Sequence, residues 1–135
     1  MNLYEKKMEN IKENHRNNLT QPKGDWPEMV QRARRFIIIH LFTEKLTVGW
    51  MKKKCRINSH NFSAKFARFA GRTPKQFIVY HRVAVAKKLL KSPAFVDLSI
   101  SEIAYELGFA TVSTFSKAFK RKVGMPPGRW RKEHL

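Results

Sequence analysis

The hydrophobic and polar positions of this chain alternate with the period of an α-helix, most clearly between residues 98 and 131. Ser99 followed by Glu102 is a capping-box sequence, which predicts the start of a helix. The apolar residues that follow lie on one helical face: Ile100, Ile103, Ala104 and Leu107. Gly108 is the residue type that ends a helix in a left-handed conformation. A short helix is therefore expected between Ser99 and Gly108.

A second helix is predicted directly after this turn, with Thr111 as its N-cap and Gly124 at its end. Phe115, Phe119 and Val123 give it one apolar stripe. Polar and basic residues lie on the opposite face: Ser113, Lys117, Lys120 and Arg121. Pro126 and Pro127 suit the first turn of a short final helix that carries Trp130. A basic, polar second helix in such a pair is what a DNA major groove accepts.

The same signals predict further helices over residues 27–45, 47–55, 59–70 and 74–91. The 27–45 helix is apolar over more than one stripe, so it must be buried on more than one side. Either the core of its own domain covers it, or a second copy of the protein does. The pattern leaves a homodimer through this helix open.

Residues 1–24 are mostly polar and charged. Four residues recur at spacings of four and three, which would give a short amphipathic helix one apolar face: Tyr4, Met8, Ile11 and His15. The same composition fits a disordered arm, which is the alternative we favour. Residues 21–24 are typical of a linker.

The helical pattern occurs twice. Thr47 and Ser99 lie 52 residues apart, and past the turn the offset becomes 53. Matched pairs at that offset are Phe62/Phe115, Phe66/Phe119, Gly71/Gly124, Pro74/Pro127 and Phe77/Trp130. The expected fold is therefore all-α, with two helix-turn-helix subdomains (residues 25–73 and 93–135) joined by a long linker helix (74–92). That linker would span about 28 Å at 1.5 Å per residue, close to the ~34 Å repeat of B-DNA.

Charge is distributed unevenly over this pattern. The net charge is +18, and 19 of the 28 Lys and Arg but only 4 of the 10 Asp and Glu lie in residues 47–135. A basic excess in the part with the strongest helical pattern indicates a polyanionic partner. The alternative is a basic surface that is merely solvated.

Several functional classes are disfavoured. The lone Cys55 allows no disulfide framework, zinc cluster or redox pair within one chain, and we expect no cofactor or metal. The N-terminus is too polar for a secretory signal peptide. The longest apolar run, Phe36–Ile39, is too short to cross a membrane.

Residues 103–131 resemble the signature of the AraC/XylS family of transcription regulators. The matching residues are Ile103-Ala104, Gly108-Phe109, Phe115-Ser116, Phe119-Lys120, Gly124, Pro127 and Trp130-Arg131. The resemblance extends more loosely over residues 27–135. It implies about seven helices in two helix-turn-helix subdomains, a sequence-specific regulator of double-stranded DNA with no enzymatic activity, and two recognition helices in successive major grooves.

The resemblance also implies site residues. Base contacts from the second recognition helix would be Val112, Ser113, Ser116 and Lys117. Those from the first would be Ser59, His60, Ser63 and Ala64. Implied phosphate contacts are Thr47, Lys53, Arg68, Arg72, Lys75, Lys120, Arg121, Arg129 and Arg131. Two of these roles have open alternatives, because Lys117 could contact only phosphate and His60 could be merely exposed.

The first unit departs from the family pattern. Ala64 stands where an arginine is common, Lys52 where the helices usually pack on alanine, and Arg56 where the turn usually has glycine. We therefore expect a first unit that is distorted or that mainly binds phosphates.

Family analogy makes an activator the expected role, with RNA polymerase as a partner and a cytoplasmic, nucleoid-associated location. Residues 1–26 are too few to enclose a small molecule, so control would come from protein abundance, from RNA polymerase or from a companion sensor. Three rivals stay open: an RNA-binding protein, a DNA-alkyl-transfer enzyme, which would need an activated thiolate, and an architectural DNA protein without sequence preference.

Overall fold

The computed structural model describes residues 1–135 and consists of eight α-helices and one short 3₁₀ helix, with no strand. In chain order these are α1 (Leu3–Asn17), α2 (Glu28–Ile39), α3 (Val48–Lys54), α4 (Phe62–Ala70), α5 (Pro74–Leu90), η1 (Pro93–Phe95), α6 (Ile100–Glu106), α7 (Val112–Val123) and α8 (Pro127–His134). The all-α fold expected from the sequence is confirmed, and α1 is additional to the seven expected helices.

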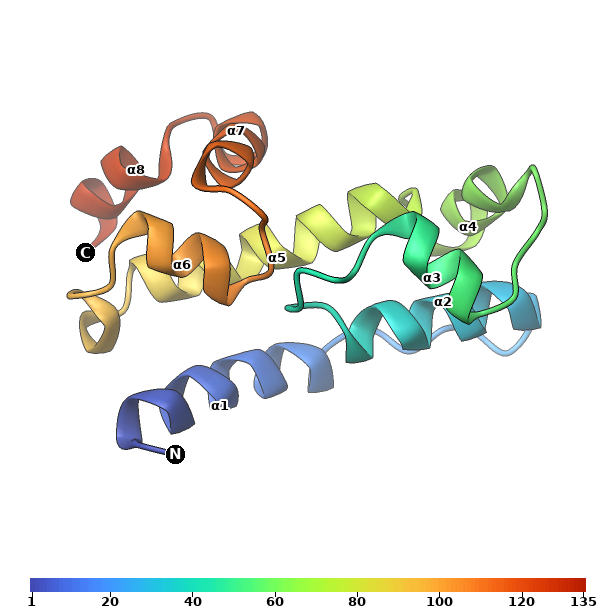
Figure 1. Cartoon of the computed structure of the whole chain (residues 1–135), viewed down its shortest axis with the longest axis horizontal. Coiled ribbons are helices and arrows are strands. Elements are labelled where there is room, and N and C mark those ends of the chain that lie inside the picture. The colour runs from blue at the N-terminus through green and yellow to red at the C-terminus, as the bar shows by residue number, and fades with distance from the viewer.

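Helix α5 is the axis of the molecule (Figure 1). Helices α2, α3 and α4 gather around its N-terminal half and are called the first unit below. Helices α6, α7 and α8, with η1, gather around its C-terminal half and are called the second unit. Helix α1 runs below the second unit in this view, and its C-terminal end lies near the end of α2. The two helix-turn-helix pairs, α3–α4 and α6–α7, are therefore carried on one long helix.

Predicted capping residues set most helix ends. The hydroxyls of Thr47, Thr73, Ser99 and Thr111 each accept a hydrogen bond from a backbone N–H in the first turn of the helix that follows. Thr73 and Ser99 form complete capping boxes, with Gln76 and Glu102 respectively. Gly71 and Gly124 end α4 and α7 with φ of 86° and 98°, a left-handed conformation that glycine adopts at little cost.

One hydrophobic core runs through both units. Its largest fully buried side chains include five phenylalanines: Phe62, Phe66, Phe95, Phe115 and Phe119. Burying an aromatic side chain of this size contributes roughly 1.5–3 kcal/mol. The apolar residues that recur at the 52- and 53-residue offsets are thus core residues in both copies.

Helix α2 is shorter than expected, because it ends at Ile39 rather than at Lys45. The chain turns there and presents backbone carbonyls to a side chain from α5. The buried Arg82 donates from Nε to the Leu41 carbonyl (2.8 Å) and from Nη2 to the Thr43 carbonyl (3.0 Å). In a helix that ran to Lys45 the Leu41 carbonyl would accept from the Lys45 N–H instead of from Arg82, so the prediction of a helix to Lys45 was wrong.

Helix α4 also differs from the prediction, because it begins at Phe62 and not at Ser59. Its N-cap, Asn61, makes no side-chain capping bond. Instead, the Ser59 hydroxyl accepts a hydrogen bond from the Asn61 N–H (3.3 Å). Such a local serine turn competes with the first turn of a helix. Ser59 and His60 therefore lie in the loop before the helix.

The disordered arm that we favoured for residues 1–24 is not what the structure has. Helix α1 forms, with a capping box at Asn2 and Glu5. Met8, Lys12 and His15 are buried against the rest of the molecule. The spacing that indicated an amphipathic helix was the correct signal.

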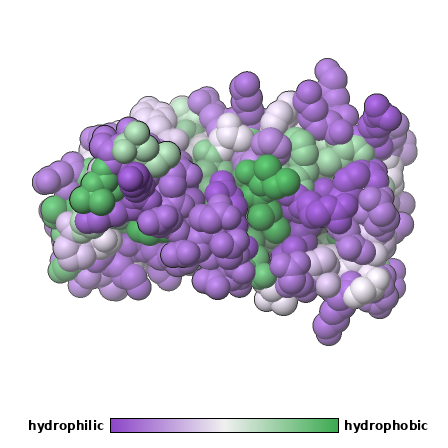
Figure 2. Space-filling model, turned by 90° about the horizontal axis from the view of Figure 1, so that it is seen from below, coloured by the Kyte–Doolittle hydropathy of each residue, from purple (hydrophilic) through white to green (hydrophobic).

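The apolar side chains of α2 are largely covered within the chain, where α2 packs against α3 and α4, the other two helices of the first unit. Ile39 is the exception, with 66% of its surface exposed. Figure 2 views the molecule from the side of α1 and shows a mostly hydrophilic surface on which apolar atoms form small separate patches. The broad apolar surface of α2 is thus explained by intramolecular packing.

Candidate nucleic-acid interface

Helix α7 presents the polar face that the sequence predicted. Phe115 and Phe119 point inward and are fully buried. Ser113 and Lys117 are exposed in its first two turns, while Val112 and Ser116 are partly exposed. The four predicted base-contact residues of the second unit therefore share the accessible side of one helix, as a helix needs if it is to enter a groove.

A groove between α5 and α7 continues this face. Its lining residues are Lys75, Gln76, Val79, Phe109, Thr114, Lys117, Ala118, Arg121 and Lys122. Four of them are cations and none is acidic. None of these four cations forms an ion pair within the chain. Unpaired cations along a concave surface suit the phosphate backbone of a nucleic acid.

The turn before α7 is held tightly in place. Gly108 has φ of 91°. A Cβ atom there would lie 2.9 Å from Arg82 Nη2 and 3.0 Å from the backbone carbonyl carbon of Phe42. Only glycine fits this close approach, which packs the turn of the second unit against Arg82 and against the chain that follows α2. The position of α7 is consequently coupled to α5 and to the first unit.

The first unit presents a different surface. Ser63 and Ala64 are exposed in the first turn of α4, and Arg68 is exposed one turn later. Lys53 is exposed near the end of α3. Thr47 is also exposed, although its hydroxyl oxygen accepts the capping bond from the Trp50 N–H (3.0 Å). Helix α4 itself has two cations, Lys65 and Arg68, whereas α7 has four.

The turn of the first unit keeps its geometry although Arg56 replaces glycine. Arg56 has φ of 55°, and it is the only non-glycine residue of the chain with positive φ. The left-handed conformation costs a non-glycine residue of order 1–2 kcal/mol. Lys52 lies partly buried beside it. The expected distortion of the first unit is seen at the start of α4, not in the turn itself.

Three arginines expected at phosphates have partners within the chain. The Arg72 guanidinium stacks over the Tyr80 ring, 3.6 Å from its centroid. Arg129 lies 3.5 Å from the Glu133 carboxylate. Arg131 donates to the backbone carbonyls of Leu98 (2.5 Å) and Phe95 (2.8 Å), joining α8 to the loop after α5.

Among the polar residues that line the groove, sequence reasoning missed Gln76, Thr114 and Lys122. Lys122 directly follows Lys120-Arg121, so the run of cations was a usable signal. Gln76 was not singled out in the sequence, and its place beside α7 depends on tertiary packing.

Other chemistry finds no support in the side chains. Cys55 is buried, and burial raises the pKa of its thiol, so the reactive thiolate is disfavoured. No group of three or more His, Cys, Asp or Glu side chains is arranged to hold a metal ion. None of the helices combines the length and apolar character that a bilayer crossing requires.

Comparison with known proteins agrees with this geometry. A family model described as "Helix-turn-helix domain" matches residues 52–133. The HTH-type transcriptional regulator AlkR of Acinetobacter baylyi is 31% identical over 96 residues, which are 70% of this chain and 30% of AlkR. A putative AraC-like transcription regulator of Streptomyces lividans is 29% identical over 86 residues, covering 64% of this chain and 27% of that protein.

The bifunctional transcriptional activator/DNA repair enzyme AdaA of Bacillus subtilis is 30% identical over 114 residues, which cover 84% of this chain and 51% of AdaA. The chain thus spans about half or less of the length of these relatives. Among solved structures, the C-terminal domain of AraT, a response regulator from Geobacillus stearothermophilus, superposes with a TM-score of 0.72 at 27% identity. That match covers 83% of this chain and 90% of the AraT domain.

Proposed function

We propose that this chain, which belongs to the AraC-type family of helix-turn-helix transcription regulators, binds double-stranded DNA by placing α4 and α7 in successive major grooves. The observation that carries the proposal is the basic groove between α5 and α7. Its four cations have no internal ion-pair partner, and it adjoins the exposed first turns of a helix with a polar, basic face. Phosphates would neutralise the groove while the helix reads base edges.

Helix α7 would contribute more than α4 to the recognition of bases. Lys117 can donate to guanine O6 and N7, Ser113 and Ser116 can donate or accept, and Val112 can contact a thymine methyl group. On α4, Ser63 and Ala64 offer less discrimination. Ser59 and His60 would reach DNA only from the loop that precedes α4.

Phosphate contacts would come from cations that form no ion pair or hydrogen bond within the chain: Lys53, Lys75, Lys120, Arg121, Lys122 from the groove, and Arg68, whose guanidinium lies 5.7 Å from the Phe69 ring centroid. Thr47 can still donate its hydroxyl hydrogen to a phosphate. Arg72, Arg129 and Arg131 contribute less in this proposal, because each already interacts with another group of the chain.

The length of α5 supports the two-groove arrangement. Its 17 residues span about 25 Å at 1.5 Å per residue, and α4 lies beside its N-terminal end while α7 lies further along it (Figure 1). The length of this helix is of the order of one turn of B-DNA, ~34 Å. One chain would therefore bind two short sequence elements, called boxes below, on one face of the duplex.

The regulator would act without catalysis, as an activator that contacts RNA polymerase. Buried Cys55, with its raised thiol pKa, argues against an alkyl-transfer reaction of its own. A homodimer would have to use a surface other than the covered face of α2.

Salt-dependent binding tests the basic groove directly. Fluorescence anisotropy with a duplex of random sequence would be measured at several salt concentrations for the natural chain and for Arg121→Ala/Lys122→Ala. Losing two phosphate contacts should reduce the slope of log K against log salt by about 1.8.

The matched control is Lys6→Ala/Lys7→Ala, which removes the same charge from exposed positions of α1 and should leave the slope unchanged. Competition by single-stranded RNA distinguishes an RNA-binding protein from a protein that binds duplex DNA. An equal slope change in both variants, or stronger competition by RNA than by duplex DNA, would contradict the proposal.

A further inference from the structure

Helix α1 lies outside residues 52–133, the stretch that matches the family, yet it packs closely on the rest of the molecule. It lies along α5 and crosses from the second unit to the first (Figure 1). Met8, Lys12 and His15 on this face are between 2% and 8% exposed. A helix with this buried face restrains the elements that the face touches.

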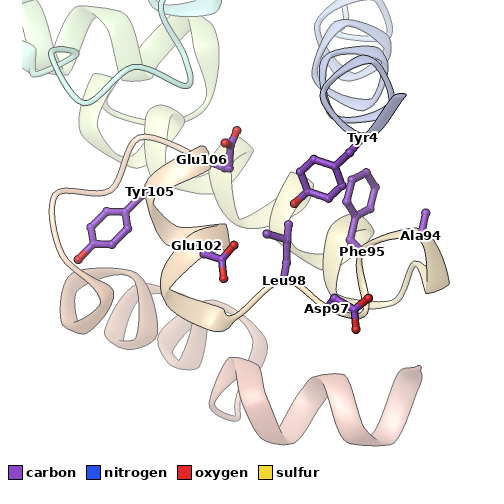
Figure 3. A pocket seen from close by; sticks show the side chains of 8 residues that line it. All are labelled: Tyr4, Ala94, Phe95, Asp97, Leu98, Glu102, Tyr105 and Glu106. Carbon is purple, nitrogen blue, oxygen red and sulfur yellow. The ribbon is translucent and has the colours of Figure 1, made fainter. Parts of the chain in front are cut away.

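The N-terminal half of α1 touches the second unit. Figure 3 shows the Tyr4 ring against Phe95, beside the carboxylate of Glu106. The Tyr4 and Phe95 rings meet edge to face, with centroids 5.3 Å apart. Two turns further along α1, the Lys12 ammonium lies 3.1 Å from Glu106 Oε2 on α6. One aromatic pair and one largely buried ion-pair cation thus attach α1 to η1 and α6.

The C-terminal half of α1 touches the first unit and α5. Arg16 donates from Nε to the Ile38 carbonyl at the end of α2 (3.1 Å), and its guanidinium lies 5.0 Å from the centroid of Phe42. His15 Nε2 lies 3.0 Å from His81 Nδ1 on α5. The Lys12 ammonium also lies 5.6 Å from the Phe42 centroid, so this one side chain contacts both units.

Little else holds the two units in register. The extensive helix packings join the helices of each unit to one another and to α5, and none joins a first-unit helix to a second-unit helix. Beyond α5 itself, the links are Gly108, which packs against the Phe42 backbone, and Arg82, which binds the Leu41 and Thr43 carbonyls and lies 5.4 Å from the Phe109 ring. A bend in α5 would change the angle between α4 and α7 unless a second strut opposed it.

We propose that α1 is this second strut: it braces the two units against each other and fixes the spacing of the two DNA boxes that one chain can bind. Tyr4 and Lys12 act as positioning residues on the second unit, and Arg16 is the anchor on the first unit. The effect of α1 on the spacing of DNA boxes rests on the proposed function, whereas its effect on the relative orientation of the two units does not.

The geometry is tested without DNA. Spin labels would be placed on α4 and α7 of the full chain through Lys65→Cys and Lys122→Cys, in a Cys55→Ser background, and the distance between them measured by double electron–electron resonance. The natural α1 should give one narrow distance distribution. Tyr4→Ala/Lys12→Ala should broaden it. Tyr4→Phe/Lys12→Arg, which keeps the ring and the charge, should restore it.

The control for charge and helix content is Lys7→Ala, on the exposed face of α1, which should keep the narrow distribution. Circular dichroism would confirm that each variant is folded, and Tyr4→Ala alone would replace the double variant if that variant melts. An unchanged distribution in a folded Tyr4→Ala/Lys12→Ala chain, or an equal broadening in Lys7→Ala, would overturn the brace.

DNA spacing is tested with duplexes whose two boxes are at the preferred separation or shifted by two base pairs. The ratio of the two affinities should fall by about tenfold in Tyr4→Ala/Lys12→Ala, which is part of the roughly 10²–10⁴-fold gain that linked binding sites give. An unchanged ratio together with a broadened distance distribution would overturn the role in spacing. A natural chain with no preference for two boxes would refute the proposed function, while the label distances would still decide whether α1 braces the units.

Discussion

The first and second units are built on the same buried framework. In the first, the rings of Phe62, Phe66 and Phe77 follow one another at centroid distances of 5.8 and 5.7 Å. In the second, Phe115, Phe119 and Trp130 do so at 5.9 and 5.8 Å. The interiors repeat nearly residue for residue, so whatever distinguishes the units lies outside the core.

The exposed faces of α4 and α7 differ clearly. At the 53-residue offset, Lys117 corresponds to Ala64 and Lys120 to Ala67. Lys122 corresponds to the partly buried Phe69. Helix α7 also has 12 residues and a threonine cap, whereas α4 has 9 and no side-chain cap. Core packing and the exposed surface are therefore separable properties of one motif, and in the proposed function the second unit carries more of the base reading.

The largest expected effect tests the shared framework. Phe66→Ala and Phe119→Ala each remove a fully buried ring, and each should lower the free energy of unfolding by about 3–5 kcal/mol. Urea denaturation monitored by circular dichroism measures both. If one variant lost less than about 1 kcal/mol of unfolding free energy and the other lost about 3–5 kcal/mol, the two cores would not be equivalent.

The stability of the chain should depend on pH through His81, because α1 places His15 beside it and has no corresponding contact with His134. His81 and His134 correspond at the 53-residue offset, and each lies against the ring four residues before it, at 4.5 and 4.0 Å. Only His81 is buried, beside His15, and burial lowers the pKa of both His81 and His15 from 6.5 to about 4.

Because unfolding raises these histidine pKa values, the unfolded chain binds more protons between pH 6.5 and 4. Stability is then greatest above pH 6.5 and is lost as the pH falls toward 4, by roughly 3 kcal/mol if one histidine of the pair dominates. Urea titrations at several pH values measure the loss. His81→Gln should flatten it and His134→Gln should not, and a profile that responds equally to both variants would contradict the assignment.

Substitutions at Lys117 and at the corresponding Ala64 test whether α7 recognises bases more strongly than α4. Lys117→Ala should lose about 1–3 kcal/mol of binding on the preferred duplex and relax specificity at one base position. Ala64→Lys should raise affinity and steepen the salt slope by about 0.9 if the new ammonium meets a phosphate. Anisotropy with the preferred duplex and its single-base variants measures both changes. An equal loss on every duplex for Lys117→Ala would show that Lys117 touches only phosphate.

The smallest effect concerns the helix starts. Thr111→Ala removes the capping bond to the Thr114 N–H (3.0 Å) and should cost about 1 kcal/mol of stability. Ser59→Ala removes only the loop bond to Asn61, so it should cost less than about 0.5 kcal/mol. Equal costs would mean that Ser59 supports the start of α4 as Thr111 supports that of α7.

Local chemistry made most of the fold predictable. Helix ends that carry a cap or a glycine, such as Ser99 and Gly124, were placed correctly because the signal lies within a few residues of the end. The end of α2 was missed because it is set by Arg82, about 40 residues away in the chain. The start of α4 was missed because Ser59 forms a turn with Asn61 in the loop that precedes the helix.

The candidate site shows the same division. The exposed face of α7 follows from helical periodicity, so Ser113 and Lys117 were found. The partners of Arg72 and Arg131 could not be, because an aromatic face and two carbonyls are brought to them only by tertiary packing. The buried face of α1 was underestimated since two of its buried residues, Lys12 and His15, are polar.

Selection of bound duplexes from a random library tests the central claim most directly. Two recognition helices of unequal strength predict two boxes whose centres lie about one helical turn, ~10–10.5 base pairs, apart. The box read by α7 should be the more sharply defined, and it should lose definition at one position when the selection is repeated with Lys117→Ala. A single box, or no consensus at all, would contradict the account of one chain that reads DNA with two unequal helix-turn-helix units.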